Sequence, residues 1–167
     1  MTQVYLGESL IDLSGELPKV GSIAPNFLLA KGKNLENHTL ENFKGKKIIL
    51  NIFPSLNTPV CSATTQKFNK LANDMDNTVV LCISRDLAWH QEEFCLNNNL
   101  KHVIFLSDMR SEEFGTSYGI IHTNGKFQGL LARSVVVIDE NEKIVYTELV
   151  PQTGHEPDYD KVVKVLI

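Results

Sequence analysis

A short apolar run, followed by a proline and then by a helix start, is the feature that most constrains the fold of this chain. Residues 48–53, Ile-Ile-Leu-Asn-Ile-Phe, have the length and composition of a buried strand. Pro54 ends that strand, because proline cannot donate a hydrogen bond to a sheet. Thr58 and Pro59 are typical of a helix start, with a hydroxyl side chain at the N-cap and proline at the first helical position. We therefore expect a strand, a turn and a helix in direct succession.

This arrangement places Cys61 in the first turn of the predicted helix. Apolar residues continue beyond it at helical spacing, at Phe68, Leu71, Ala72 and Met75. The first turn of a helix has unpaired backbone N–H groups and the positive end of the helix dipole. Both favour a thiolate over a thiol, and the thiolate is the form in which cysteine acts as a nucleophile.

The remainder of the chain alternates between apolar runs and amphipathic segments. We expect a small hairpin around residues 7–9, short strands within 26–31 and 37–40, buried strands at 79–83 and 103–106, and a hairpin formed by 135–138 and 143–146. Helices are expected at 88–97, at 111–118 with Ser111 as N-cap, and at 157–166. This order predicts a mixed α/β sheet in a single domain, residues 1–167, with residues 1–17 as an N-terminal hairpin extension.

Composition narrows the class of protein. A chain of 167 residues suits one domain with a core of its own. A net charge of -4 argues against nucleic acid or an anionic membrane surface as a partner. No run approaches the roughly 20 apolar residues of a membrane span. The first residues lack the basic region and the apolar stretch of a secretory signal, so we expect a cytoplasmic protein.

The three cysteines, Cys61, Cys82 and Cys95, are too few for a disulfide scaffold. In a reducing compartment such cysteines are buried hydrophobes, ligands or redox catalysts. The chain has no Cys-x-x-Cys pair, and its five histidines do not stand at metal-ligand spacing. We therefore predict neither a metal nor another cofactor.

The residues around Cys61 also carry a family resemblance. Pro54-x-x-x-Thr58-x-x-Cys61 resembles the active-site motif of the peroxiredoxins. The wider run from Asn51 to Cys61 is similar to the thiol peroxidase branch, the atypical two-cysteine peroxiredoxins. Further segments that resemble this branch follow in the same order over nearly the whole chain, at 77–84, 94–95, 106–110, 132–139 and 156–159. The resemblance implies a thioredoxin-like fold, in which helices flank a mixed central sheet.

The resemblance also implies a set of catalytic residues. Cys61 would be the peroxidatic nucleophile, with the Thr58 hydroxyl beside its sulfur and Pro54 shielding it from water. Arg133, at the start of the strand 134–138, would supply hydrogen bonds and a fixed positive charge. Each residue has an ordinary alternative role when taken singly: an N-cap for Thr58, a surface ion pair for Arg133, a strand end for Pro54 and a buried hydrophobe for Cys61. Their joint occurrence at the motif spacing favours the catalytic interpretation.

Attack on peroxide would leave Cys61 as a sulfenic acid, which a second thiol must convert into a disulfide before further oxidation. Cys82 lies inside an apolar run, whereas Cys95 lies in a polar and helical segment that could unwind. The resemblance assigns Cys95 as the resolving cysteine, implies a Cys61–Cys95 disulfide and leaves Cys82 structural. Because a disulfide requires Cα atoms within about 7 Å, we expect both the Cys61 turn and the Cys95 helix to rearrange on oxidation.

Two positions depart from the family pattern. Leu96 follows Cys95 where the family often has a small residue, and it could oppose unwinding of the Cys95 helix. The asparagines at 97–99 could instead ease that unwinding. Asn57 stands where the family commonly has an acid before the threonine. The loss of a nearby negative charge would favour ionisation of Cys61.

The resemblance implies an antioxidant enzyme, a thioredoxin-dependent peroxiredoxin that reduces hydrogen peroxide and organic hydroperoxides. Thioredoxin would reduce the disulfide, and the chain would form a homodimer. One alternative function is a peroxide sensor or redox relay, which passes oxidation to a partner protein and turns over little. Another is an inert thioredoxin-like binding module, in which peroxide would cause no loss of titratable thiols.

Overall fold

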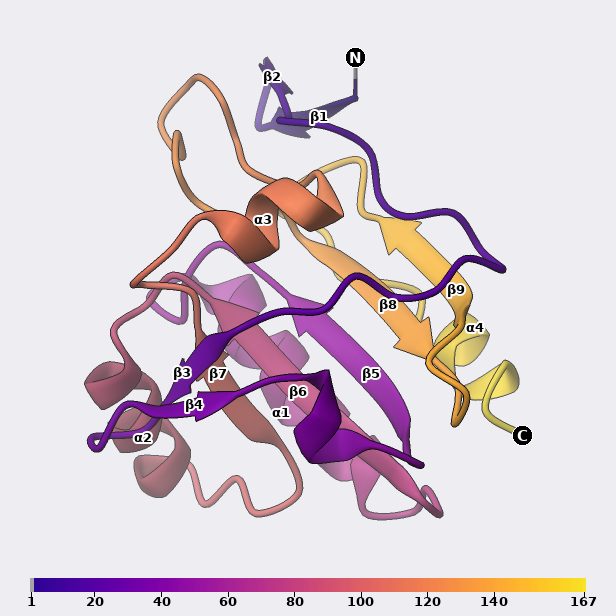
Figure 1. The fold of residues 1–167 in the computed structure, drawn as a ribbon. Coiled ribbons are helices and arrows are strands. Elements are labelled where there is room, and N and C mark those ends of the chain that lie inside the picture. The colour runs from indigo at the N-terminus through magenta and orange to yellow at the C-terminus, as the bar shows by residue number, and fades with distance from the viewer. Residues whose placement is uncertain (1) are drawn as a thin grey trace.

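The computed structural model describes residues 2–167, and a mixed sheet forms its centre (Figure 1). Its strands are β3 (Leu29–Lys31), β4 (Glu36–His38), β5 (Lys47–Ile52), β6 (Thr78–Ser84), β7 (Ile104–Ser107), β8 (Ser134–Ile138) and β9 (Ile144–Leu149). Their order across the sheet is β4-β3-β7-β6-β5-β8-β9. β5, β6 and β7 run parallel, and β8 pairs antiparallel with β5. The apolar runs that the sequence places in β5, β6 and β8 are therefore in the middle of the sheet.

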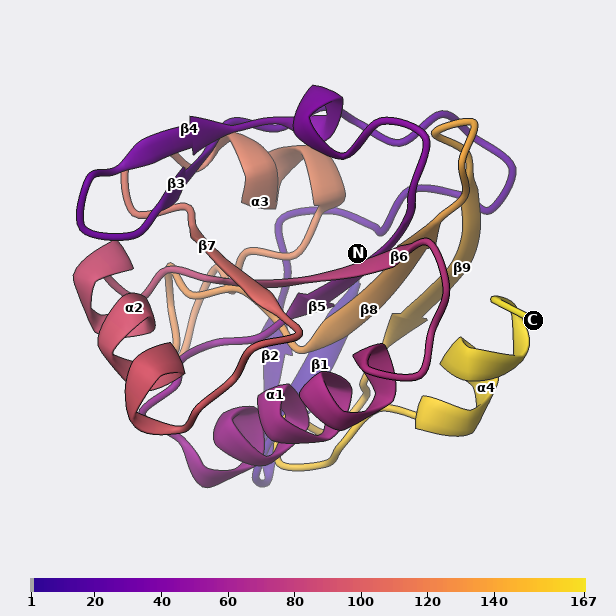
Figure 2. The ribbon, with the colours of Figure 1, turned by 90° about the horizontal axis from the view of Figure 1, so that it is seen from below.

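Side chains that alternate along β5 divide the core into two layers. Ile48, Leu50 and Ile52 belong to the layer covered by the 3-10 helix η1 (Leu40–Phe43) and by α3 (Glu113–Tyr118). Ile49 and Phe53 belong to the opposite layer. That second layer is covered by α1 (Pro59–Ala72), α2 (Ala88–Asn97) and α4 (Tyr159–Lys164). Figure 2 shows α3 on one side of the sheet and α1 with α4 on the other.

All three cysteines belong to this second layer. Cys61 and Cys82 are buried in it, and Cys95 is partly buried against it. The layer also holds the edge-to-face contact of Phe68 on α1 with Tyr159 on α4, at 5.2 Å between ring centroids. The three thiols therefore lie on one face of the sheet, the face covered by α1, α2 and α4.

The N-terminal strands β1 (Gln3–Leu6) and β2 (Ser9–Asp12) form a separate antiparallel hairpin. Strand β1 is joined to the segment after β9, because the amide of Tyr5 donates to the carbonyl of Pro151 at 2.8 Å. In return, the amide and the hydroxyl of Thr153 both donate to the carbonyl of Tyr5, at 2.8 and 2.7 Å. The hairpin thereby supports the segment around Thr153, which contacts the candidate site.

The predicted mixed α/β sheet with an N-terminal hairpin is confirmed, and the predicted strands and helices are all present with small shifts of their ends. One detail was wrong. The N-cap of α3 is Glu112 rather than Ser111, although the Ser111 hydroxyl accepts a hydrogen bond from the amide of Glu113 at 3.1 Å. The domain limits 1–17 and 1–167 stay predictions, and Met1 lies outside the described residues. Within residues 2–167, no helix has the length and apolar character needed to span a bilayer.

Candidate active site at Cys61

The turn after β5 delivers Cys61 to the start of α1, as the sequence predicts. Thr58 has extended backbone angles and is the N-cap, Pro59 is the first helical residue, and Cys61 is the third. The side chain of Cys61 is 0% exposed, and Pro54 in the preceding turn is also buried. The sulfur therefore lies in a dry environment at the positive end of a helix of 14 residues, and both conditions strengthen its interaction with nearby donors.

Arg133 is the charged group that contacts this sulfur. Its Nη2 donates to Cys61 Sγ at 3.2 Å, and its Nε donates to the carbonyl of Thr153 at 2.9 Å. The register of the sheet explains the approach, because Ser134 at the start of β8 pairs with Ile52 at the end of β5. Arg133 is only 3% exposed, so it is not the surface ion-pair partner that the ordinary alternative requires. Its Nη1 has no hydrogen-bond partner among residues 2–167.

Thr58 closes the turn rather than capping the helix with its side chain. Its hydroxyl donates to the carbonyl of Ser55 at 3.0 Å, and its amide donates to the same carbonyl at 3.2 Å. Within the described part of the chain, the Thr58 side chain makes no capping hydrogen bond to α1. The first-turn amides near Cys61 are thus not covered by this hydroxyl, which leaves them free to stabilise negative charge.

Asp86, which no sequence pattern singled out, holds the same turn from the segment that follows the neighbouring strand β6. Its carboxylate accepts hydrogen bonds from the Ser55 hydroxyl at 2.7 Å, from the amide of Leu56 at 2.8 Å and from the Ser84 hydroxyl at 2.6 Å. The one signal in the sequence is an acidic residue two positions after the end of a buried strand, β6, that runs parallel to β5. Such residues lie at the same edge of the sheet as the turn that follows β5.

Cys82 lies on β6 and is fully buried. The side-chain amide of Asn51 donates to its sulfur at 3.5 Å. Burial raises the pKa of the Cys82 thiol to about 12, against a smaller opposing effect of that hydrogen bond. Cys82 is therefore held as a neutral thiol in the core.

Cys95 lies on α2, four residues after Gln91, and is partly exposed. Its thiol donates to the carbonyl of Leu100 at 3.0 Å. Burial raises the pKa of this thiol above its usual value, and the nearby charge of Lys31 partly opposes that effect. All three cysteines are free, so the structure is that of the reduced protein. The Cys61 and Cys95 thiols have separate partners in it, Arg133 and the carbonyl of Leu100, and the rearrangement of both segments on oxidation stays a prediction.

An open cleft of about 470 Å³ lies beside the first turn of α1. It is lined by Pro59, Val60, Ala63, Gly154, His155 and Glu156. The segment 154–156 directly follows Thr153, whose carbonyl holds Arg133. The family resemblance reaches this wall of the cleft only at Glu156, and it does not mark Thr153, whose contribution is a backbone carbonyl.

Comparison with known proteins identifies relatives that match over nearly the full length of the chain. The sequence matches the redoxin family, described as Redoxin, over residues 19–163. It is 44% identical over 153 residues to a thiol peroxidase of Corynebacterium glutamicum, covering 92% of each chain. It is 43% identical over 164 residues to a thiol peroxidase of Listeria innocua, covering 98% of this chain and 97% of that one. The chain belongs to the thiol peroxidases of the redoxin family.

Solved structures agree with this family. A peroxiredoxin-like protein from Aquifex aeolicus superposes with a TM-score of 0.92 at 34% identity, over 99% of this chain and 96% of that one. A thiol peroxidase from Chromobacterium violaceum has the same TM-score at 18% identity and the same coverage, a likeness that shows the fold alone. The predictions of a thioredoxin-like fold and of a peroxiredoxin-type enzyme are therefore confirmed.

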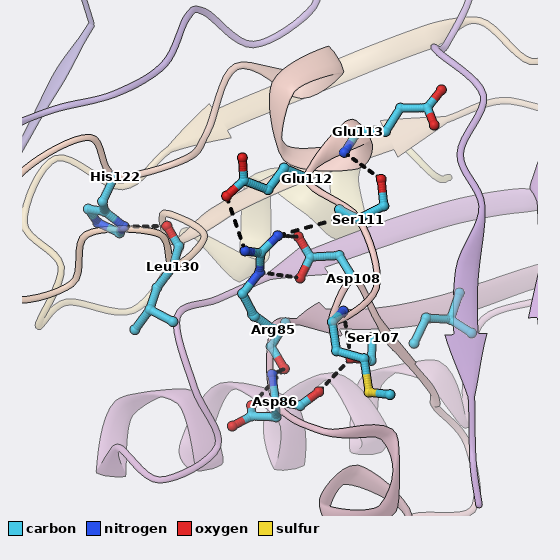
Figure 3. Close-up of polar contacts among 12 residues, drawn as sticks. Arg85, Asp86, Ser107, Asp108, Ser111, Glu112, Glu113, His122 and Leu130 are labelled. Carbon is cyan, nitrogen blue, oxygen red and sulfur yellow. Dashed lines mark hydrogen bonds and ion pairs between the residues drawn. The ribbon is translucent and has the colours of Figure 1, made fainter. Parts of the chain in front are cut away.

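A second polar cluster of this thiol peroxidase lies just beyond the carboxyl ends of β6 and β7, next to Asp86, and involves no cysteine (Figure 3). Arg85 pairs with the buried carboxylate of Asp108 at 3.2 Å and with the exposed carboxylate of Glu112 at 3.4 Å. Within residues 2–167, no group of three or more histidine, cysteine or acidic side chains is arranged to hold a metal ion. The cluster therefore ties the end of β6 to the loop before α3.

Proposed function

We propose that this chain reduces hydrogen peroxide and organic hydroperoxides through Cys61. The observation that carries the proposal is the 3.2 Å contact between Arg133 Nη2 and Cys61 Sγ at the start of α1. A guanidinium that is always charged stabilises a thiolate, and it does so more strongly in a site without water. Membership of the thiol peroxidases supports the same activity.

In the proposed first step the Cys61 thiolate attacks one oxygen of the peroxide. The O–O bond breaks, the attacked oxygen stays on sulfur as a sulfenic acid, and the other oxygen leaves and takes a proton to form water or an alcohol. Arg133 is the donor best suited to the negative charge that develops on the leaving oxygen, since its Nη1 has no partner within residues 2–167. Thr58 closes the turn and Pro54 keeps water from the sulfur.

In the proposed second step the Cys95 thiol attacks the sulfenic sulfur of Cys61. An intramolecular Cys61–Cys95 disulfide forms and water leaves. Cys95 is partly exposed and lies on the same face of the sheet as Cys61, which supports this assignment. A dithiol such as thioredoxin would then reduce the disulfide by exchange and return both thiols. Cys82 is a poor alternative, because its thiol is fully buried and its pKa is raised to about 12.

Mass spectrometry of the peroxide-treated protein tests these assignments directly. We expect a peptide pair joined through Cys61 and Cys95. Cys61→Ser should abolish peroxide consumption, whereas Cys95→Ser should allow one turnover and accumulate sulfenic acid. A disulfide that survives Cys95→Ser but is lost in Cys82→Ser would overturn the choice of resolving cysteine.

Steady consumption of NADPH in the presence of peroxide, thioredoxin and its reductase distinguishes a peroxidase from a relay. The peroxidase should turn over continuously, whereas a sensor or relay would stall after one oxidation until a specific partner protein is added. The homodimer and the cytoplasmic location stay predictions, which size-exclusion chromatography with light scattering and cell fractionation can test.

A further inference from the structure

The carboxylate of Asp86 accepts hydrogen bonds from the turn between β5 and α1, residues 54–58. Asp86 Oδ1 accepts from the Ser55 hydroxyl at 2.7 Å, and Oδ2 accepts from the backbone amide of Leu56 at 2.8 Å. The turn is braced further from within, since the Ser55 hydroxyl also accepts from the amide of Asn57 at 3.1 Å. Hydrogen bonds to an ionised carboxylate are stronger than those between neutral groups. Asp86 is therefore a major restraint on the segment that leads directly into the Cys61 helix.

The same carboxylate is linked to the helix that carries Cys95. The Ser84 hydroxyl donates to Asp86 Oδ2 at 2.6 Å and accepts from Gln91 Nε2 at 3.0 Å. Gln91 is 1% exposed and lies four residues before Cys95, which places it one turn earlier on the same side of α2. A continuous series of hydrogen bonds thus runs from the turn 54–58 through Asp86 and Ser84 to α2.

Asp86 itself is held by the sheet. Its carbonyl accepts from the Ser107 hydroxyl at 2.5 Å (Figure 3), and its amide donates to the Ser84 hydroxyl at 3.3 Å. Ser84 and Ser107 are paired residues at the ends of the parallel strands β6 and β7. The backbone of Asp86 is therefore fixed to the ends of β6 and β7, and its carboxylate restrains the turn 54–58 and α2.

We propose that Asp86 is a positioning residue for both cysteines, which locks the turn before Cys61 and the helix of Cys95 into the arrangement that attacks peroxide. The inference rests on the proposed function. In the reduced structure Cys61 contacts Arg133, while Cys95 donates to the carbonyl of Leu100. The disulfide requires the two Cα atoms to come within about 7 Å, so the restraints on both segments must be released after the first step.

Such a lock affects the two chemical steps in opposite directions. It speeds the attack on peroxide, because it holds Cys61 at the helix start beside Arg133. It slows disulfide formation, because the hydrogen bonds that hold the turn and α2 must break first. A residue that only stabilises the fold would not separate the two steps in this way.

The test is Asp86→Ala, measured separately in each step. The rate constant for oxidation of Cys61 by hydrogen peroxide is measured by stopped flow in the Cys95→Ser background, in which no disulfide can form. The rate of disulfide formation is measured after a single peroxide addition, by acid quench and mass spectrometry, with Cys95 present. We expect the first rate to fall about tenfold, the effect of roughly one hydrogen bond to a charged group, and the second to rise several-fold. The fraction of Cys61 over-oxidised to sulfinic acid should fall in consequence.

Three further variants make the result specific. Asp86→Asn keeps the shape and one acceptor oxygen, so both rates should lie between those of the wild type and of Asp86→Ala. Ser55→Ala removes the hydrogen bond to Asp86 and the one from the amide of Asn57 but leaves that from the amide of Leu56, so it should shift both rates in the same opposed directions. It serves as the test if Asp86→Ala does not fold. Asp139→Ala is the matched control. Asp139 also clamps a turn, by accepting from the amides of Asn141 and Lys143, but it lies at the end of β8 remote from Arg133. It should change neither rate.

Opposed shifts in Asp86→Ala and Ser55→Ala, with no shift in Asp139→Ala, support the lock. The inference is overturned if the wild type reduces peroxide but the two rates of the Asp86 and Ser55 variants fall together or stay unchanged. A wild type whose Cys61 is not oxidised at all contradicts the proposed function itself, and the inference with it.

Discussion

Arg133 donates to the sulfur of Cys61 across 3.2 Å, although 72 residues separate them in the sequence. The contact depends on two features of the fold. The antiparallel pairing of β8 with β5 places Arg133 beside the turn that precedes Cys61, and the carbonyl of Thr153 fixes the guanidinium through Nε. The position of this one charge therefore depends on the sheet and on the segment after β9 together.

Replacement of Arg133 by lysine should slow the reaction with peroxide. Lysine keeps a positive charge but cannot donate to both Thr153 and Cys61 in the fixed geometry of a guanidinium. We expect the second-order rate constant to fall about 100-fold, as for loss of a donor to developing negative charge. Stopped-flow measurement of peroxide consumption checks this, with Arg85→Lys as the matched control. Equal rate constants for Arg133→Lys and the wild type would contradict the assigned role.

Thr58→Val should reduce both activity and stability. Valine keeps the branched shape but loses the hydroxyl that donates to the carbonyl of Ser55, which closes the turn before Cys61. We expect a rate constant for peroxide lower by about tenfold and a free energy of unfolding lower by about 1 kcal/mol. Thr58→Ser, which retains the hydroxyl, should restore most of both quantities. If Thr58→Ser is as slow as Thr58→Val, the hydroxyl is not the functional group.

Local sequence patterns predicted the turn and the helix around Cys61, because the proline, the N-cap and the apolar spacing all act within a few residues. Arg133 could be predicted only from the family resemblance, since its approach to Cys61 depends on strand pairing across 72 residues. Asp86 and Thr153 were missed for physical reasons. Asp86 acts through side-chain geometry between neighbouring strands, and Thr153 acts on Arg133 through a backbone carbonyl that every residue type possesses.

Cys82 should resist modification in the folded protein. Its thiol is fully buried, and its pKa of about 12 leaves almost no thiolate at neutral pH, whereas the thiolate is the form that reacts with alkylating agents. Timed reaction of the reduced protein with iodoacetamide, followed by peptide mass spectrometry, should show Cys95 labelled well before Cys82. In urea the two should react at similar rates. Early labelling of Cys82 under native conditions would show that β6 opens to solvent.

Mild acid should destabilise the protein through His122. Its Nδ1 lies 2.7 Å from the carbonyl of Leu130, and because a carbonyl can only accept, Nδ1 carries the proton (Figure 3). Nε2 is buried without a hydrogen-bond partner in residues 2–167, so a second proton there would be a charge in the interior. Burial accordingly lowers the pKa of His122 below its usual value of about 6.5.

The sign of the effect follows from which state binds the proton. As the pH falls below about 6.5, the unfolded chain protonates this histidine while the folded chain does not, so the free energy of unfolding decreases until the lowered pKa is reached. His122→Asn offers an uncharged amide donor to Leu130 in place of the ring and should flatten this part of the pH dependence. Urea unfolding at a series of pH values between about 5 and 8, for wild type and variant, measures the difference. Parallel pH profiles for the two proteins would show that His122 takes up its proton without cost, and thus that Nε2 reaches water in the folded state.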